Sequence, residues 1–236
     1  MKYVKILFFV GLLVYSACLL SLDLQHGQYA VRGYFSDIVT ATNFPVFCDT
    51  LFGINTSISV LLLGGCALLY LVCIGSPSSK PTGWKSTLFL WSQVVFFLYV
   101  AADERLRIHE WLGGFFEVED AFILLALGVL ETFFIVYFGD VMRQSWQTKI
   151  YLLIACLFFG LMVFVDAFIH SDMLGRLAVE DLSKLWAVVF LFVYAWCCAM
   201  ERLSSSGAEN FVEINIHDSA QVGDSVGSPL CEARPR

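Results

Sequence analysis

Six long apolar runs divide the chain, and they constrain its fold more than any other feature. They cover residues 1–21, 51–74, 87–102, 121–139, 150–169 and 185–200. A helix needs about 20 residues to cross a hydrocarbon core about 30 Å thick, and most of the runs approach that length. Because lipid offers the backbone no hydrogen-bonding partners, such segments cross a membrane as helices. The runs therefore predict an all-α, polytopic transmembrane helical bundle of about six spans.

Composition supports a membrane protein and argues against a soluble domain, a nucleic-acid-binding protein and a cysteine-based zinc or redox site. Hydrophobic residues make up 58% of the 236 positions, charged residues only 15%, and the mean hydropathy is +0.75, values outside the range of ordinary soluble domains. No dense basic run is present to bind nucleic acid, so the expected partner is the lipid bilayer. The eight cysteines include no Cys-x-x-Cys pair of the kind that marks a zinc or redox site.

The two ends of the chain differ in character. Residues 1–21 carry Lys2 and Lys5 before an apolar run that is long for a signal peptide, so we expect a first transmembrane anchor. Residues 204–236 are rich in Ser, Gly, Asp and Glu and show no apolar period. We therefore divide the chain into a six-span domain, 1–203, and a disordered cytoplasmic tail, 204–236.

Six spans place both termini on one side of the membrane, and the basic residues indicate which side. One set of connections holds Lys2, Lys5, Lys80, Lys85, Arg143, Lys149 and Arg202, and the other holds Arg32, Arg105, Arg107, Arg176 and Lys184. Basic residues favour the cytoplasmic side. We therefore predict a multi-pass protein of the cell membrane, in a bacterial inner membrane, with both termini in the cytoplasm.

A charged stretch, Asp-Glu-Arg-Leu-Arg-Ile-His-Glu at 103–110, follows the short third run. That run is too short to cross the membrane alone, so the helix is expected to continue into the stretch, until Gly113-Gly114 ends it. At about 100° per residue, Asp103, His109 and Glu110 fall on one helix face.

The connection between the fifth and sixth runs lies on the same, non-cytoplasmic side and has polar residues of its own. Asp166 and His170 are four residues apart, a spacing that puts two ligands of one metal ion on one helix face. Glu180, Asp181 and Lys184 precede the short sixth run and should be drawn towards the membrane interface.

These two segments predict one polar pocket at the non-cytoplasmic end of spans three, five and six. Its candidate catalytic residues are Glu110, Asp103, Glu180 and Lys184, with Glu110 as a general base; its tentative metal ligands are His109, His170 and Asp166. Zinc or another divalent ion would activate a bound water there. The same spacings also suit ordinary ion pairs that hold helix ends together, and both interpretations stay open.

Glu131 is a separate signal, because it lies near the middle of the fourth run. An ionised side chain at that depth is costly, so Glu131 should face the interior of the bundle, protonated or paired.

The pattern Asp103-Glu104-x4-His109-Glu110, followed by Asp166 and by Glu180-Asp181-x-x-Lys184, resembles a family of uncharacterised bacterial multi-pass membrane proteins. The resemblance covers spans three to six and implies a shared site. The chain is also faintly similar to the alkaline ceramidase and progestin-receptor-like superfamily, membrane hydrolases with a Ser, Asp and His zinc site. That superfamily has seven helices and a His-x-x-x-His pair, whereas this chain has six apolar runs and no such pair.

Three functions follow as hypotheses. The first is a structural or accessory membrane protein whose interfacial charges fix the helix register. The second is a metal-dependent membrane hydrolase that acts on a lipid ester or amide. The third is a proton-coupled transporter, which rests on Glu131 and the acids of the pocket.

Overall fold

The structure is a computed structural model that describes residues 2–35, 53–76, 83–170 and 173–224, and these residues form helices and no strand. Six helices are long and apolar enough to cross a membrane. They are α1 (Lys2–His26), α3 (Ile54–Gly75), α4 (Trp84–Leu106), α6 (Asp120–Phe138), α7 (Trp146–Phe168) and α8 (Arg176–Asp224). The predicted all-α polytopic bundle of six spans is therefore confirmed.

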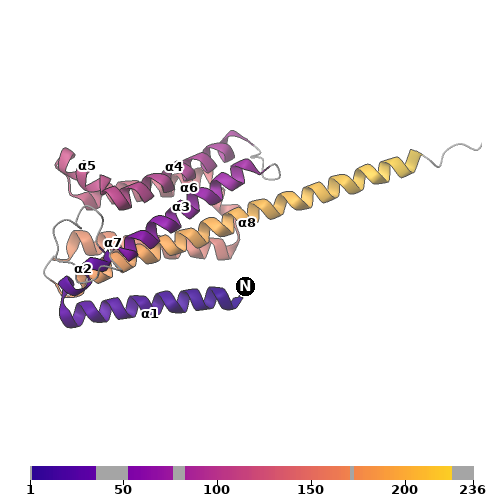
Figure 1. Ribbon diagram of the computed structural model, residues 1–236. Helices are drawn as coiled ribbons and strands as arrows, with labels where there is room; N and C mark the ends of the chain where they lie inside the picture. The colour runs from indigo at the N-terminus through magenta and orange to yellow at the C-terminus, as the bar shows by residue number, and fades with distance from the viewer. Residues whose placement is uncertain (1, 36–52, 77–82, 171–172, 225–236) are drawn as a thin grey trace, which may run out of the picture.

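The helices pass up and down between two ends of the bundle (Figure 1). Helices α7 and α8 pack along much of their length, α3 packs against α4 and α8, and α1 lies at the edge against α2 and α8. The short helices α2 (Gln28–Phe35) and α5 (Ile108–Phe116) lie at one end, while the start of α1 and the far end of α8 point to the other. The 3-10 turn η3 (Val141–Arg143) joins α6 to α7.

The centre of the bundle is an aromatic core between α3, α4 and α8. Tyr70 stacks on Phe97 with ring centroids 6.0 Å apart and meets Phe89 edge-on at 5.9 Å. Association of helices in lipid depends on such close packing. At Gly65 a Cβ atom would lie 2.9 Å from the Phe192 ring, so the absence of a side chain lets α3 approach α8.

Helix α1 is joined to the start of α8 by a buried carboxylate. Asp23 is fully buried, and its Oδ2 accepts a hydrogen bond of 3.2 Å from the backbone N–H of Ala178. The first N–H groups of a helix have no partner within the helix and carry a partial positive charge. Asp23 therefore fixes the position of the first turn of α8.

Several element ends differ from the sequence prediction. Helix α8 begins at Arg176, before the sixth apolar run, and continues to Asp224, into the segment for which the sequence predicts disorder. Residues 36–52 and 225–236 lie outside the described residues. Between the first and second apolar runs, the short helix α2 occupies Gln28–Phe35. The part of α8 that is long and apolar enough to cross a membrane is Arg176–Ser204.

Candidate functional site

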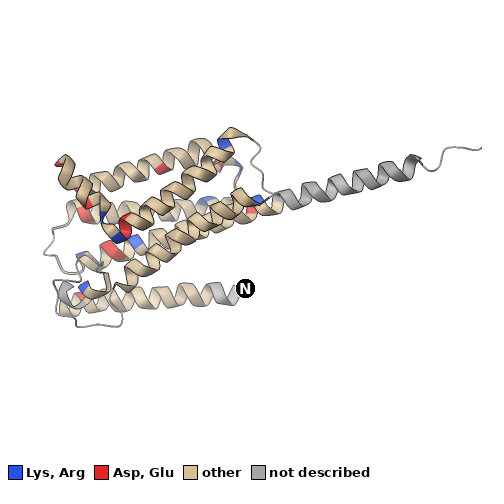
Figure 2. Cartoon of the chain, turned by 45° about the horizontal axis from the view of Figure 1, so that its top comes forward, with Lys and Arg blue, Asp and Glu red and all other residues tan. Residues whose placement is uncertain are grey.

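Many charged residues lie at the end of the bundle that carries α5 (Figure 2). They come from the end of α4, from α5, from the end of α7 and from the first turns of α8, and we call this group the charged cap. Its members are Asp103, Glu104, Arg107, His109, Glu110, Asp166, Arg176, Glu180, Asp181 and Lys184. The even number of crossings between these segments brings them to one end, as predicted.

The helix break at Arg107 shapes one half of the charged cap. Helix α4 continues past residue 102 as predicted, but it ends at Leu106 because Arg107 adopts the left-handed conformation, with φ 54°. Helix α5 then starts at Ile108 and runs through Gly113-Gly114 to Phe116. The prediction of one continuous helix face over residues 103–110 is therefore wrong, and so is the predicted end at the glycine pair.

Asp103 and His109 nevertheless meet, because Asp103 reaches across the break. Its Oδ1 accepts a hydrogen bond of 2.7 Å from the His109 backbone N–H, and its Oδ2 lies 2.8 Å from His109 Nδ1. No side chain at Arg107 caps α5, so Asp103 supplies the acceptor that the first turn of α5 needs. Burial alone lowers the pKa of His109, but the hydrogen bond and negative charge of Asp103 outweigh burial and raise the pKa above its usual value.

Lys184 is the cation at the centre of the charged cap. Its Nζ lies 3.1 Å from Glu104 Oε2 and 3.8 Å from Asp181 Oδ1, and both carboxylates are largely buried. The sequence spacing pairs Lys184 with Glu180, whereas in the structure its nearest acid comes from another helix. Glu104 Oε1 is buried, and within the described parts of the chain it has no hydrogen-bond partner.

Two arginines complete the ion pairs. Arg176 lies 2.9 Å from Asp166 Oδ1 and 3.3 Å from Glu180 Oε2, so it joins the end of α7 to the start of α8. Arg107 pairs with Glu110 within the turn that begins α5, as the spacing predicts.

The tentative metal ligands are not brought together. Helix α7 ends at Phe168, and Ile169 is extended, so His170 leaves the helix, is exposed and no longer shares a face with Asp166. His109 is held by Asp103, and Asp166 by Arg176. In the described parts of the chain, no group of three or more His, Cys, Asp or Glu side chains is placed to hold a metal ion.

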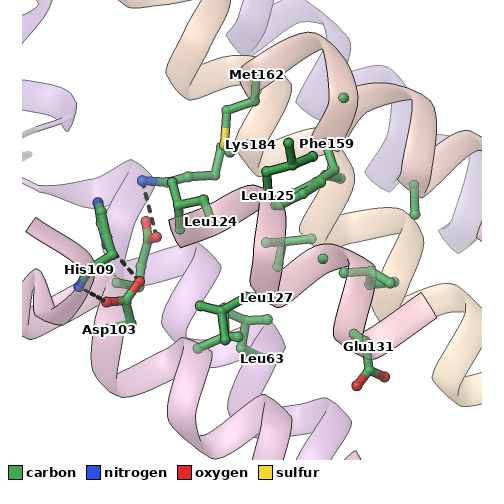
Figure 3. A pocket seen from close by; sticks show the side chains of 18 of the residues that line it. Leu63, Asp103, His109, Leu124, Leu125, Leu127, Glu131, Phe159, Met162 and Lys184 are labelled. Atoms are coloured by element: carbon green, nitrogen blue, oxygen red, sulfur yellow. Dashed lines mark hydrogen bonds and ion pairs between the residues drawn. The ribbon is translucent and has the colours of Figure 1, made fainter. Parts of the chain in front are cut away.

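A cavity of about 620 Å³ extends from the charged cap into the bundle. Its walls come from α3, α4, α6, α7 and α8, and most of the wall below the charged cap is apolar. Figure 3 shows Lys184, His109 and Asp103 at one end, Glu131 at the other, and Leu124 and Leu127 between them. On α6 the lining runs from Leu124 to Val136, which corresponds to about 18 Å along a helix axis.

Glu131 is buried, at 7% exposure, in a helix that otherwise exposes much of its surface to lipid. The nearby polar side chain is Gln93 of α4, which is fully buried. In the part of the chain that the structure describes, neither amide atom of Gln93 nor Oε1 of Glu131 has a hydrogen-bond partner. The predicted inward orientation of Glu131 is confirmed.

Four residues of this region were not among the candidate catalytic or metal-binding residues predicted from the sequence. Arg176 and Glu104 carry ion pairs, Asp23 fixes the first turn of α8, and Asn55 donates a hydrogen bond of 3.3 Å to the Asp181 carbonyl. Asp23 and Glu104 come shortly after apolar runs and Asn55 lies near the start of one, which is a signal that could have drawn attention to these three; Arg176 has no such signal.

Comparison with known proteins gives one match. The family model described as "Domain of unknown function (DUF8692)" matches residues 6–198, which include all six spans up to the last part of α8. No curated protein and no solved structure matches the chain.

Proposed function

For a chain that belongs to the DUF8692 family, whose description names no activity, we propose an accessory membrane protein that binds an amphipathic ligand inside its helical bundle. The ligand's apolar tail lies between α6, α7 and α8, and its polar head lies at the charged cap. The observation that carries this proposal is the cavity of about 620 Å³ with an apolar body and charged residues at one end.

The size and lining of the cavity suit such a ligand. Sites for small organic ligands occupy about 300–1,000 Å³ and combine apolar walls with a few polar groups that fix orientation. Here Leu127, Phe159 and Val188 belong to the apolar wall, while Lys184 and His109 belong to the polar end. A ligand with both characters satisfies both surfaces without leaving charge against a hydrocarbon chain.

The ion pairs of the charged cap support the structural part of the role. Lys184 with Glu104 joins α8 to α4, and Arg176 with Asp166 joins α8 to α7. These contacts hold three helix ends at fixed positions around the mouth of the cavity. The charges that fix the helix register thereby also keep the cavity open.

We propose further that the charged cap faces away from the cytoplasm, in the cell membrane of a bacterium, with both termini inside. The excess of Lys and Arg in the connections at the opposite end of the bundle supports this orientation.

Filling the cavity tests the proposal. Leu127 lines the cavity and is partly buried, whereas Leu130, three residues along the same helix, is 51% exposed and does not line it. We expect Leu127→Trp to weaken the binding of a fluorescent single-chain amphiphile at least tenfold, because the indole takes up ligand volume. Leu130→Trp, the matched control, should bind like the parent.

The measurement is a titration of the protein in lipid nanodiscs, with empty nanodiscs as the blank. Saturable binding that Leu127→Trp weakens and Leu130→Trp does not would support the proposal. Partition that does not saturate, or that is equal for the two variants, would contradict it.

A further inference from the structure

The charged cap has an excess of acid, and this bears on the chemistry of the ligand's head. Six carboxyl groups surround it, from Asp103, Glu104, Glu110, Asp166, Glu180 and Asp181. The fixed cations here are Arg107, Arg176 and Lys184 of the charged cap, together with Arg32 of α2, which lines the same cavity. The formal charge is therefore −2 when His109 is neutral and −1 when His109 is protonated. A head that carries a negative charge adds to this excess, whereas a cationic head reduces it.

The second observation is the unpaired oxygen of Glu104. The Glu104 side chain is only 8% exposed, and its Oε2 binds Lys184 at 3.1 Å. Its Oε1 is buried and has no hydrogen-bond partner among the residues that the structure describes, although the residue lines the cavity. A buried carboxylate oxygen left without a donor is unfavourable, because it has lost its hydrogen bonds to water and gained none in return. A hydrogen-bond donor placed inside the cavity would satisfy this oxygen.

Several neighbouring protein donors are directed at other carboxylates. Lys184 lies between Glu104 and Asp181. The Nδ1 atom and backbone N–H of His109 both lie against Asp103. The terminal nitrogens of Arg176 pair with Asp166 and Glu180, whereas its buried Nε has no hydrogen-bond partner among the described residues. None of these contacts reaches Glu104 Oε1. The donor for Glu104 Oε1 is therefore best supplied by a ligand.

We propose that the ligand is a single-chain amphiphile with a protonated amine as its head, and that this amine donates a hydrogen bond to Glu104 Oε1. This inference rests on the function proposed above and specifies the class of its ligand. Hydrogen bonds between an ammonium and a carboxylate are about twice as strong as neutral ones. The apolar tail then extends along Leu124 and Leu127 towards Glu131.

The test compares three probes with the same dodecyl chain in phosphatidylcholine nanodiscs. Dodecylamine, dodecanol and dodecyl phosphate each compete with the fluorescent amphiphile for the parent protein. We expect dodecylamine to displace it at a concentration at least tenfold lower than dodecanol, and dodecyl phosphate to be the weakest competitor.

Two variants locate the effect. Glu104→Gln should remove the preference for the amine over dodecanol, because the amide bears no charge. Glu117→Gln removes an equal charge from an exposed residue at the same end of the bundle, outside the cavity, and should keep the preference. Equal loss in both variants would assign the preference to surface charge and overturn the inference.

The three probes measured on the parent protein alone also test the inference, even if Glu104→Gln fails to fold. If dodecanol or dodecyl phosphate binds the parent as tightly as dodecylamine does, the amine head is refuted while the amphiphile cavity stands. If none of the three displaces the fluorescent amphiphile, or that amphiphile does not bind saturably, the proposed function itself fails.

Discussion

Replacing Lys184 with Met should destabilise the protein strongly, because Lys184 neutralises two largely buried carboxylates. Its Nζ is 3.1 Å from Glu104 and 3.8 Å from Asp181. At an effective dielectric constant of about 20, each attraction is worth about 4–5 kcal/mol before the loss of hydration is subtracted. Removing one partner of a buried pair costs about 3–5 kcal/mol, since the remaining charge is left uncompensated.

The partial exposure of Lys184 places the expected loss of stability near the lower end of that range. About a third of its side chain is exposed, at 32%, so water screens part of the interaction. We therefore expect Lys184→Met to lower the free energy of unfolding by about 3 kcal/mol. For a chain of this size, that loss corresponds to a fall in Tm of about 6–12 °C.

A double-mutant cycle separates this cause from simple loss of packing. Thermal unfolding in detergent, followed by tryptophan fluorescence, gives Tm for the parent, Lys184→Met, Glu104→Gln and the double variant. The double variant should be more stable than Lys184→Met alone, because Glu104→Gln removes one of the stranded charges. Arg143→Met, at an exposed position at the other end, should leave Tm nearly unchanged. Equal Tm for Lys184→Met and the parent, or strictly additive losses in the cycle, would refute the reasoning.

Three further predictions concern the depth of Glu131 in the membrane, the pH dependence of stability and the orientation of the chain in the membrane. Glu131→Gln should accumulate in the membrane nearly as the parent does, whereas Glu131→Lys should not, since a fixed cation at that depth costs about 2.5–3.5 kcal/mol on insertion scales. The pair of His109 with Asp103 should stabilise the fold fully below pH 6.5 and lose its effect as pH rises through the raised pKa of His109. A cysteine introduced at exposed Glu117 should react with an impermeant maleimide in intact cells, whereas Cys231 should react only after permeabilisation.

The results that would contradict these three predictions are distinct. Normal accumulation of Glu131→Lys would place that residue outside the buried interior. For the pH effect, the Tm difference between the parent and His109→Asn should shrink as pH rises; a constant or growing difference would exclude control by His109, whose ring also faces Lys184 and Glu110. Reaction of Cys231 in intact cells would reverse the proposed orientation.

The sequence was sufficient to predict the transmembrane spans because the thickness of the membrane sets their length. It also predicted that the segments around Asp103 and Lys184 meet at one end, since alternating crossings leave no other arrangement. The inward orientation of the Glu131 side chain was predicted from the free-energy cost of placing a charge in lipid. These predictions rest on general constraints that do not depend on side-chain packing.

The remaining details depend on contacts that a linear pattern does not contain. The left-handed turn at Arg107 has no glycine or proline to signal it, so the break between α4 and α5 was not foreseen. The i, i+4 spacing of Glu180 and Lys184 suits an ion pair along one helix, but the carboxylate nearest to Lys184 is that of Glu104 on α4. The cavity was missed because its volume depends on how loosely α6 packs against its neighbours, which no residue pattern specifies.

The most direct test of the amphiphile cavity is photo-crosslinking followed by peptide mapping. A dodecylamine derivative with a diazirine near the end of its chain is incorporated into nanodiscs that contain the protein, irradiated, and the labelled residues are identified by mass spectrometry. We predict adducts at cavity-lining positions such as Leu127, Phe159 and Val188, which excess unlabelled dodecylamine removes. Adducts confined to lipid-facing positions such as Leu130 and Leu157, and unaffected by the competitor, would contradict the account.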